Sequence, residues 1–278
     1  MPSTDLERFS LKGKNIVVTG ACGLLGRQHS EVIAEAGGVP ILIDIAIPPL
    51  EALSTQLFSK HQVRALHFVA DISQKSDLEY CLKEIQARLG GIHGLVNNAA
   101  NNPKMESQDR NSGWMRFENL DISIWEKDLA VGLTGAFLCC QVFGSAMSGA
   151  GGGVIVNISS DLSLIAPDQR LYRIPGLPDS QQPVKSVTYS VVKTGLIGLT
   201  RYLAGYWACQ GVRVNAISPG GVENGQPVDF QDRLSTLIPL GRMARVDEYR
   251  AALLFLLSDA SSYMTGTNMV VDGGRTVL

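Results

Sequence analysis

Short apolar runs recur along the chain, and most are followed by a segment with helical periodicity. The runs that predict strands lie at 15–20, 39–45, 64–72, 93–100, 152–160, 211–218 and 267–274. Helices are predicted through EVIAEAGG and over 75–90, 122–148, 188–210 and 246–258. Because the runs are continuous rather than alternating, both faces of the sheet are expected to be covered. The pattern therefore predicts an α/β fold with a doubly wound parallel sheet of about seven strands and helices on both faces.

No linker, composition break or internal repeat divides the sequence, so residues 1–278 are predicted to form a single domain. Two segments, 101–121 and 161–187, interrupt the alternation of strands and helices. Loops of this length in a compact domain are usually functional or mobile. We therefore interpret 161–187 as an inserted substrate loop.

Composition and charge exclude several classes of function. The formal net charge of −2 argues against a nucleic-acid partner, which requires a basic surface. No apolar run approaches the roughly 18 residues that span a bilayer, and the polar start MPSTDLERFS is not a signal peptide. Five cysteines without metal-like spacing predict no metal site, and they suit reduced thiols in a cytoplasmic protein or small core residues.

The stretch TGACGLLG at 19–26 lies between the first strand and the first helix. Gly20 permits a tight turn, Gly23 permits close approach of a phosphate to the backbone, and Gly26 permits close packing of helix against strand. The helix N-terminus adds unpaired N–H groups and partial positive charge. The turn therefore predicts a Rossmann-type dinucleotide site, lined also by Cys22, Leu24 and Leu25.

Asp44 falls at the end of the second strand, about 20 residues beyond the glycines. A carboxylate there can bind both ribose hydroxyls of NAD and would repel the 2′-phosphate of NADP. No Arg or Lys follows it in DIAIPP to hold that phosphate. Asp44 predicts NAD rather than NADP, the alternative being that it only caps the next turn.

Seven motifs then follow in a fixed order: the glycine turn, Asp71 in VADI, NNAA at 97–100, NISS at 157–160, YSVVK at 189–193, SPGGV at 218–222 and VDGG at 271–274. Together they resemble the short-chain dehydrogenase/reductase family over essentially the whole chain, in its single-domain branch. The glycine spacing alone looks like the family's larger branch, which acts on sugar nucleotides.

The resemblance implies a set of cofactor contacts. Asp71 and Ile72 would border the adenine, and Asn98 and Ala99 the ribose, with Asn97 a structural hydrogen-bonding residue. Pro219, Gly220 and Val222 would flank the nicotinamide, and Asn224 stands where the family usually has a threonine for the carboxamide. The family also implies a homotetramer or homodimer, packed through two long helices.

Tyr189 and Lys193 lie one helical turn apart and face the same side of the predicted helix. Tyrosine, with an ordinary pKa of about 10, is a poor base at neutral pH. The Lys193 ammonium, together with the positive charge of oxidised nicotinamide, is expected to lower the pKa of Tyr189, and Lys193 can also bind the nicotinamide ribose. Ser160 would stabilise the substrate oxygen. We interpret these three residues as catalytic, the alternative being a strand-end serine and a helix-surface pair.

Gly132 marks one departure from the resemblance. The segment reads VGLTGAF where the family usually has VNLTGAF, with an asparagine that holds a water relaying protons to the lysine. Glycine has no side chain for this, so the proton exchange is expected to be impaired or rerouted. The glycine carbonyl, or extra waters in the vacated space, offers a substitute.

A second departure is the 29-residue separation of Ser160 and Tyr189, roughly twice what the family leads us to expect. The extra material lies at the predicted active-site mouth. Its candidate substrate residues are Asp161, Gln169, Arg170, Tyr172 and Arg173, and it also carries Lys185. Arginines beside a pocket suit a carboxylate or phosphate, whereas a solvated loop making oligomer contacts is the alternative.

The insert also resembles proteins of bacterial flagellin modification and legionaminic-acid-type sugar pathways, which implies an anionic sugar substrate. The sequence thus predicts an NAD-dependent oxidoreductase that transfers a hydride between nicotinamide and a hydroxyl or keto group of a sugar or sugar phosphate. Two alternatives remain at this point. One is a sugar epimerase or dehydratase that keeps its NAD bound, and the other is a regulator that senses NAD without chemistry.

Overall fold

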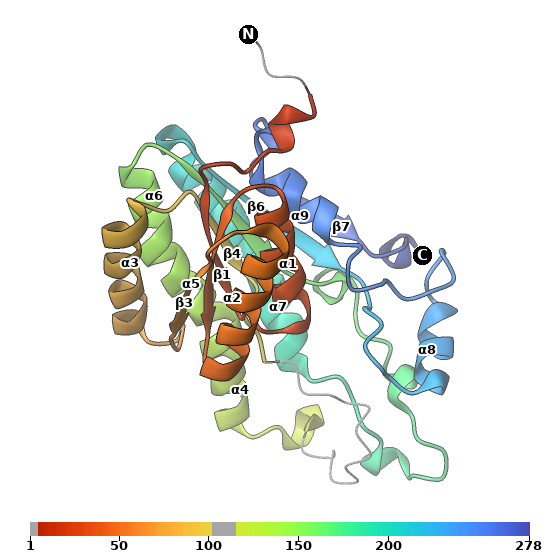
Figure 1. The fold of residues 1–278 in the computed structure, drawn as a ribbon. Coiled ribbons are helices and arrows are strands. Elements are labelled where there is room, and N and C mark those ends of the chain that lie inside the picture. The colour runs from red at the N-terminus through yellow and green to blue at the C-terminus, as the bar shows by residue number, and fades with distance from the viewer. Residues whose placement is uncertain (1–4, 102–114) are drawn as a thin grey trace.

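The computed structural model describes residues 5–101 and 115–278, and Figure 1 shows their arrangement. Seven parallel strands form one sheet in the order β3-β2-β1-β4-β5-β6-β7. They are β1 (Asn15–Thr19), β2 (Val39–Asp44), β3 (Leu66–Val69), β4 (Gly94–Asn97), β5 (Gly153–Ile158), β6 (Val212–Pro219) and β7 (Asn268–Val271). This confirms the predicted doubly wound Rossmann-type fold.

Helices cover both faces of the sheet (Figure 1). One face carries α1 (Leu24–Glu35), α2 (Ile47–His61) and α9 (Arg250–Leu257), over a core that includes Leu50, Leu53 and Leu253. The other carries α3 (Lys75–Leu89), α4 (Ile122–Leu129), α5 (Gly135–Cys139), α6 (Ser145–Gly149) and α7 (Val187–Trp207). Burial of both sheet faces explains why the strands read as continuous apolar runs.

The elements α4, α5 and α6 form one helical run, Ile122–Gly149, joined by two π-helical turns. An 18-residue window of this run has a mean hydropathy of 1.6, so the run is long and apolar enough to cross a bilayer by length and composition. No unbroken apolar run approaches that length, as expected, because polar residues such as Thr134 and Gln141 interrupt it, but we did not expect the helix predicted over 122–148 to be this apolar as a whole. In the fold the run packs beside α3 and α7, and its Cys139, Phe143 and Met147 are fully buried, as in a core helix.

The structure adds elements that the periodicity missed. Helix α2 directly follows the second strand, with prolines in its first turn, and α8 (Val228–Ser235) precedes the last helix. Most of the segment 101–121 lies outside the described residues. The insert 161–187 holds three short 3₁₀ turns rather than a disordered loop.

The insert packs on α8. Leu171 joins a small apolar cluster with Phe230 and Leu234 of that helix, and the Arg233 guanidinium donates to the Leu171 carbonyl at 2.8 Å. Because these contacts involve buried side chains, the insert has a fixed position next to the carboxyl end of β5.

Buried amides align the strands with α7. The Asn97 side chain donates to Asn157 at 2.8 Å, and the Asn157 amide donates to the Thr200 hydroxyl of α7 at 2.8 Å. Asn157 is fully buried, so both bonds are shielded from water. This chain of hydrogen bonds fixes the register between the strand that ends before Ser160 and the helix that carries Tyr189. It also confirms the structural role predicted for Asn97.

Candidate active site

The strand order reverses between β1 and β4, and in open α/β sheets ligands bind in the crevice at that point. The glycine turn lies there. Gly20 has a φ of 60°, and a Cβ on it would lie 2.8 Å from the Ala99 Cα. A Cβ on Gly26 would lie 2.1 Å from the Gly20 carbonyl oxygen. Only glycine therefore fits at these two positions, and α1 begins directly after Gly23 with its N–H groups toward the crevice.

The NNAA segment holds the glycine turn in shape. The Asn98 amide donates to the carbonyls of Thr19 and Gly20, each at 3.0 Å. The Thr19 hydroxyl in turn accepts from the backbone N–H groups of Asn98 and Ala99. Asn98 therefore supports the turn as well as bordering the predicted ribose position.

Both predicted roles of Asp44 have a structural basis. One carboxylate oxygen accepts from the Cys22 N–H at 2.9 Å and the other from the Ile45 N–H at 2.8 Å, so Asp44 does cap the neighbouring turn. Each oxygen keeps a further lone pair that can accept from a ribose hydroxyl. Burial, with Asp44 close by, raises the pKa of the Cys22 thiol to about 11, so this thiol is protonated at neutral pH.

The remaining predicted cofactor residues differ in exposure. The Asp71 carboxylate accepts a hydrogen bond from the Ser73 hydroxyl. Ile72 is only 7% exposed, and a Cβ on Gly135 would lie 2.7 Å from the terminal methyl group of Ile72. Ile72 therefore packs mainly in the core. At the end of β6, Gly220 lies against Asp272, since a Cβ there would come within 2.8 Å of the Asp272 Cα.

Beyond Gly220 the chain turns outward. Val222 pairs with Ala244 in an isolated bridge, and the Asn224 N–H donates to the Gln226 side chain at 2.8 Å. Pro219, the last residue of β6, lies at the carboxyl edge of the sheet with them. The fold thus brings the predicted nicotinamide residues to the same edge as the glycine turn.

The structure brings Ser160, Tyr189 and Lys193 together. Ser160 follows β5 directly, Tyr189 and Lys193 lie on one face of α7, and the Tyr189 side chain lies next to the Ser160 hydroxyl. The Lys193 ammonium donates to the Ile158 carbonyl at 2.8 Å, and the Ser159 hydroxyl donates to the Lys193 carbonyl at 2.7 Å. Ser160 and Lys193 are each 4% exposed, so both polar groups lie inside the protein.

Burial dominates the acidity of this cluster. It raises the pKa of Tyr189 above the ordinary value, although the neighbouring Ser160 hydroxyl opposes the shift. It also lowers the pKa of Lys193 to about 8, with the nearby Lys185 adding to the effect. In the protein without its cofactor, burial therefore outweighs any lowering by Lys193. The predicted lowering, which includes the positive charge of oxidised nicotinamide, stays a prediction. A base at Tyr189 needs positive charge beyond that of Lys193.

Gly132 lies in the π-helical turn Ala130–Thr134, against α7. A Cβ on Gly132 would lie 2.5 Å from the Val192 Cγ1. We expected empty space where the asparagine side chain would stand. That expectation is wrong, because the Val192 side chain fills the position that a Cβ on Gly132 would take. The glycine permits close packing of the long helix on α7 next to Lys193.

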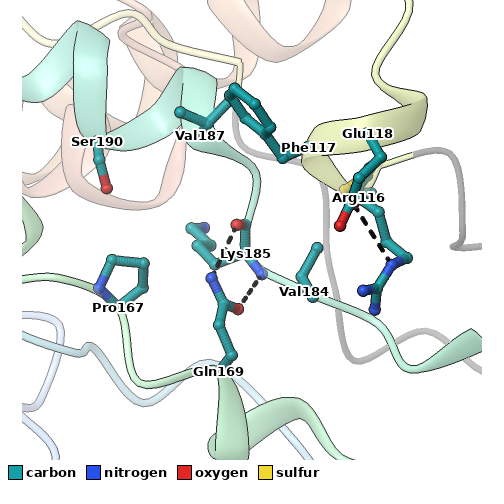
Figure 2. Close-up of a pocket in the computed structure, with 10 residues that line it drawn as sticks. Arg116, Phe117, Glu118, Pro167, Gln169, Val184, Lys185, Val187 and Ser190 are labelled. Carbon is teal, nitrogen blue, oxygen red and sulfur yellow. Dashed lines mark hydrogen bonds and ion pairs between the residues drawn. The ribbon is translucent and has the colours of Figure 1, made fainter. Parts of the chain in front are cut away.

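The insert delivers a second lysine to the site. The Gln169 side chain accepts from the Lys185 N–H at 2.8 Å and donates to the Lys185 carbonyl at 3.3 Å, as Figure 2 shows. The Lys185 ammonium lies 4.0 Å from the centre of the Tyr189 ring, closer than that of Lys193 at 5.8 Å. Gln169 therefore positions Lys185 rather than being free for a ligand.

A cavity of about 340 Å³ opens beside this lysine. The residues that line it are Met115, Arg116, Phe117, Glu118, Pro167, Gln169, Val184, Lys185, Val187 and Ser190 (Figure 2). Among the described residues, the Ser190 hydroxyl is buried without a hydrogen-bond partner. A polar ligand in the cavity can pair with this group.

The other substrate candidates lie elsewhere. Arg170 is ion paired with Asp168 and Arg173 with Asp179, and both guanidinium groups are largely exposed. Tyr172 packs against Phe230 of α8. The described wall of the cavity includes none of these three candidates. Asp161 is only 3% exposed and pairs with Arg275, so its environment is that of a structural charge rather than of a substrate contact.

The glycine turn at the sheet crevice and a serine, tyrosine and lysine beside it define a nicotinamide-dependent oxidoreductase. Comparison with known proteins agrees. The family model described as short chain dehydrogenase matches residues 14–171, and one described as Enoyl-(Acyl carrier protein) reductase matches 180–276. The chain belongs to the short-chain dehydrogenase/reductase family.

Individual relatives match over nearly the full chain. A protein named D-threitol dehydrogenase from Mycolicibacterium smegmatis is 34% identical, over 99% of this chain and 97% of its own. An NAD-dependent glycerol dehydrogenase from Listeria innocua is 32% identical, over 97% and 96%. The structure of a gluconate 5-dehydrogenase from Burkholderia cenocepacia with NADP and tartrate is 27% identical, covers 99% of this chain and 100% of its own, and superposes with a TM-score of 0.82.

The contact between Gly132 and Val192 predicts a stability effect. Gly132→Ala places a methyl group 2.5 Å from the Val192 side chain, so either Val192 must leave its rotamer or the two helices must separate. We expect its free energy of unfolding, measured by urea denaturation, to fall by about 1–3 kcal/mol. The control is Gly149→Ala in the same helical run, where a Cβ meets nothing within 4 Å. A Gly132→Ala protein as stable as the Gly149→Ala protein would show that the close contact is absent.

Proposed function

We propose that this protein is an NAD-dependent dehydrogenase that interconverts a secondary alcohol and a ketone on a polyol or sugar. The observation that carries the proposal is the close placement of Ser160 and Tyr189, with the buried Lys193 beside them and the glycine turn at the same sheet edge. The names of the two relatives, a threitol and a glycerol dehydrogenase, support a polyhydroxy substrate.

The protein's own residues handle the proton. Nicotinamide, when bound, supplies or accepts the hydride. Tyr189 takes the hydroxyl proton of the alcohol in oxidation and returns it in reduction. Ser160 donates a hydrogen bond to the substrate oxygen as negative charge develops there. Lys193, held by the Ile158 carbonyl, keeps two N–H groups for the ribose and adds positive charge near Tyr189.

Asp44 supports NAD as the cofactor. Its charge lies at the end of β2 beside the glycine turn, where it favours ribose hydroxyls and repels a 2′-phosphate. The residues that follow, Ile45 to Pro49, include no cation to bind such a phosphate. The relatives do not decide the matter, since one is named for NAD and the gluconate dehydrogenase structure holds NADP.

We further propose that the insert 161–187 is the substrate loop. It contributes Gln169, Val184 and Lys185 to the cavity, and α7 contributes the unpartnered Ser190 hydroxyl. Hydroxyl groups of a polyol can pair with the Ser190 hydroxyl and the Lys185 ammonium. Lys185 and Arg116 are the cations of the described cavity wall, where Arg116 is ion paired with Glu118. A carboxylate or phosphate on the sugar would bind beside them rather than at Arg170 or Arg173, which lie outside that wall. The narrower likeness to flagellin-modification and legionaminic-acid proteins stays a prediction.

We also propose a homo-oligomer, a tetramer or a dimer, in the cytoplasm. Phe137 on α5 and the stacked pair Tyr202 and Tyr206 on α7 are large apolar side chains that are 47%, 66% and 62% exposed. Exposed aromatics on adjacent long helices suit a contact with a second copy of the chain. A single-chain mass measured by light scattering would contradict the oligomer.

All five cysteines are free thiols, which suits a reducing compartment such as the cytoplasm.

Removal of the Tyr189 hydroxyl tests the proposed base. In Tyr189→Phe we expect kcat for polyol oxidation, followed as NADH absorbance, to fall by about 100- to 10,000-fold. NADH binding, measured by fluorescence, should stay within a few fold, since the ring remains. Tyr80→Phe on the exposed face of α3 is the matched control and should behave as wild type. Turnover that survives in Tyr189→Phe would contradict the proposal.

Neutralisation of Asp44 tests the cofactor assignment. Asp44→Asn keeps a hydrogen-bond acceptor for the Cys22 N–H but removes the charge. We expect the ratio of kcat/KM with NAD to that with NADP to fall by about 10- to 100-fold. Glu51→Gln, an exposed carboxylate on α2, controls for the loss of one charge. The assignment to NAD is wrong if the wild-type protein already prefers NADP.

A further inference from the structure

Arg275 and Asp161 form an ion pair deep inside the protein. The Arg275 guanidinium lies 2.7 Å from an Asp161 carboxylate oxygen, and the two side chains are 7% and 4% exposed. In every other ion pair between described residues, both side chains are at least 13% exposed. Burying two charged groups costs folding free energy unless good hydrogen bonds offset the loss of water. This pair is therefore a candidate for a functional role.

A tight turn after β7 brings Arg275 to this position. The Asp272 carboxylate accepts from the N–H groups of Gly274 at 2.9 Å and Thr276 at 2.7 Å. Gly273 and Gly274 have φ values of 67° and 90°, which side chains rarely tolerate. The VDGG motif thus starts the short helix Arg275–Val277 and directs Arg275 inward. Chain segments 114 residues apart meet at this pair.

The second carboxylate oxygen of Asp161 faces the catalytic cluster. It accepts from the Ser160 hydroxyl at 2.8 Å and from the Leu162 N–H at 2.8 Å. One carboxylate therefore joins Arg275 on one side to Ser160 on the other. A serine hydroxyl has a single proton, so the proton donated to Asp161 is withheld from Tyr189 and from a substrate oxygen.

We propose that Asp161 and Arg275 are a positioning pair, in which Arg275 fixes the carboxylate and the carboxylate orients the Ser160 hydroxyl and competes for its proton. This inference rests on the proposed function of Ser160 and Tyr189 and adds two residues that act through them. It also assigns the C-terminal turn a part in the reaction.

Other titratable groups face the same cluster. They are Lys185 from the insert, Lys193 and Tyr189 from α7, Tyr249 before α9, Asp272 from the C-terminal turn and Asp168, which lies near Arg275. Both lysines lie on the Tyr189 side and Tyr249 binds the Gly220 carbonyl. Asp168 and Asp272 bond to Arg170 and to the C-terminal turn, respectively, whereas Asp161 bonds to Ser160 directly.

The sign of the effect on Tyr189 follows from two contributions. The Asp161 charge raises the pKa of Tyr189, and a hydrogen bond donated by Ser160 to the tyrosine would lower it. Neutralising Asp161 removes the first contribution and weakens the competition for the Ser160 proton, because an amide oxygen is a weaker acceptor than a carboxylate. Both changes favour the ionised tyrosine, so alcohol oxidation should begin at lower pH.

The experiment compares pH profiles of kcat/KM for polyol oxidation. In Asp161→Asn we expect the acid limb, where activity rises with pH, to move about 1 pH unit lower. In Asp161→Asn/Arg275→Met the limb should move back toward the wild-type position, because the uncompensated cation is gone. Arg275→Lys should keep the wild-type limb, since it retains the cation. Arg88→Met, which breaks an exposed pair with Glu84, is the control.

Thermal unfolding of the same variants gives a readout that does not depend on turnover. The double variant should unfold at a higher temperature than Asp161→Asn, because the single variant leaves a buried arginine unpaired. A purely structural pair would change the unfolding temperature and leave the acid limb unmoved in every variant. That result, with Tyr189→Phe inactive, overturns the inference and leaves the proposed function standing. An active Tyr189→Phe would instead remove the proposed function itself.

Discussion

The attachment of α7 to the end of β5 is the contact on which the rest of the site depends. Two hydrogen bonds make it directly, from the Lys193 ammonium to the Ile158 carbonyl and from the Ser159 hydroxyl to the Lys193 carbonyl. A third link, through Asn157 and Thr200, lies deeper in the core. Because all of these groups are buried, water cannot replace the bonds, and the relative position of Ser160, Tyr189 and Lys193 is fixed before any ligand binds.

This rigidity has an electrostatic cost. Burial raises the pKa of Tyr189 and lowers that of Lys193, so each residue is held toward its neutral form. The surrounding charges then decide the balance. Lys185 lies over the tyrosine ring, and Asp161 opposes it from the Ser160 side while paired with Arg275. The insert and the C-terminal turn thus both contribute to the proton chemistry that we propose for Tyr189.

The sequence was sufficient for the fold and for the cluster of predicted site residues, because both rest on local patterns. Continuous apolar runs reflect a sheet covered on both faces, and the glycine turn reflects contacts that exclude a Cβ at Gly20 and Gly26. Burial and partners at long range were not predictable in this way. The net rise in the Tyr189 pKa, the filling of the space beside Gly132 by Val192, and the pairing of Asp161 with Arg275 depend on side chains far apart in the chain. The arginines of the insert misled for a different reason. Their acidic partners, Asp168 and Asp179, lie only 2 and 6 residues away, but the pairing depends on the local turns that the insert adopts.

Transfer of deuterium from substrate to cofactor tests the central claim most directly. The wild-type protein would be incubated with NAD and a short polyol deuterated at its secondary carbinol carbons, and the recovered cofactor examined by NMR. A hydride-transferring polyol dehydrogenase places the label on C4 of the nicotinamide, in amounts equal to the ketone formed. Ketone or reduced cofactor formed without the label, or no reduction of NAD across a panel of polyols and sugars, would contradict the account.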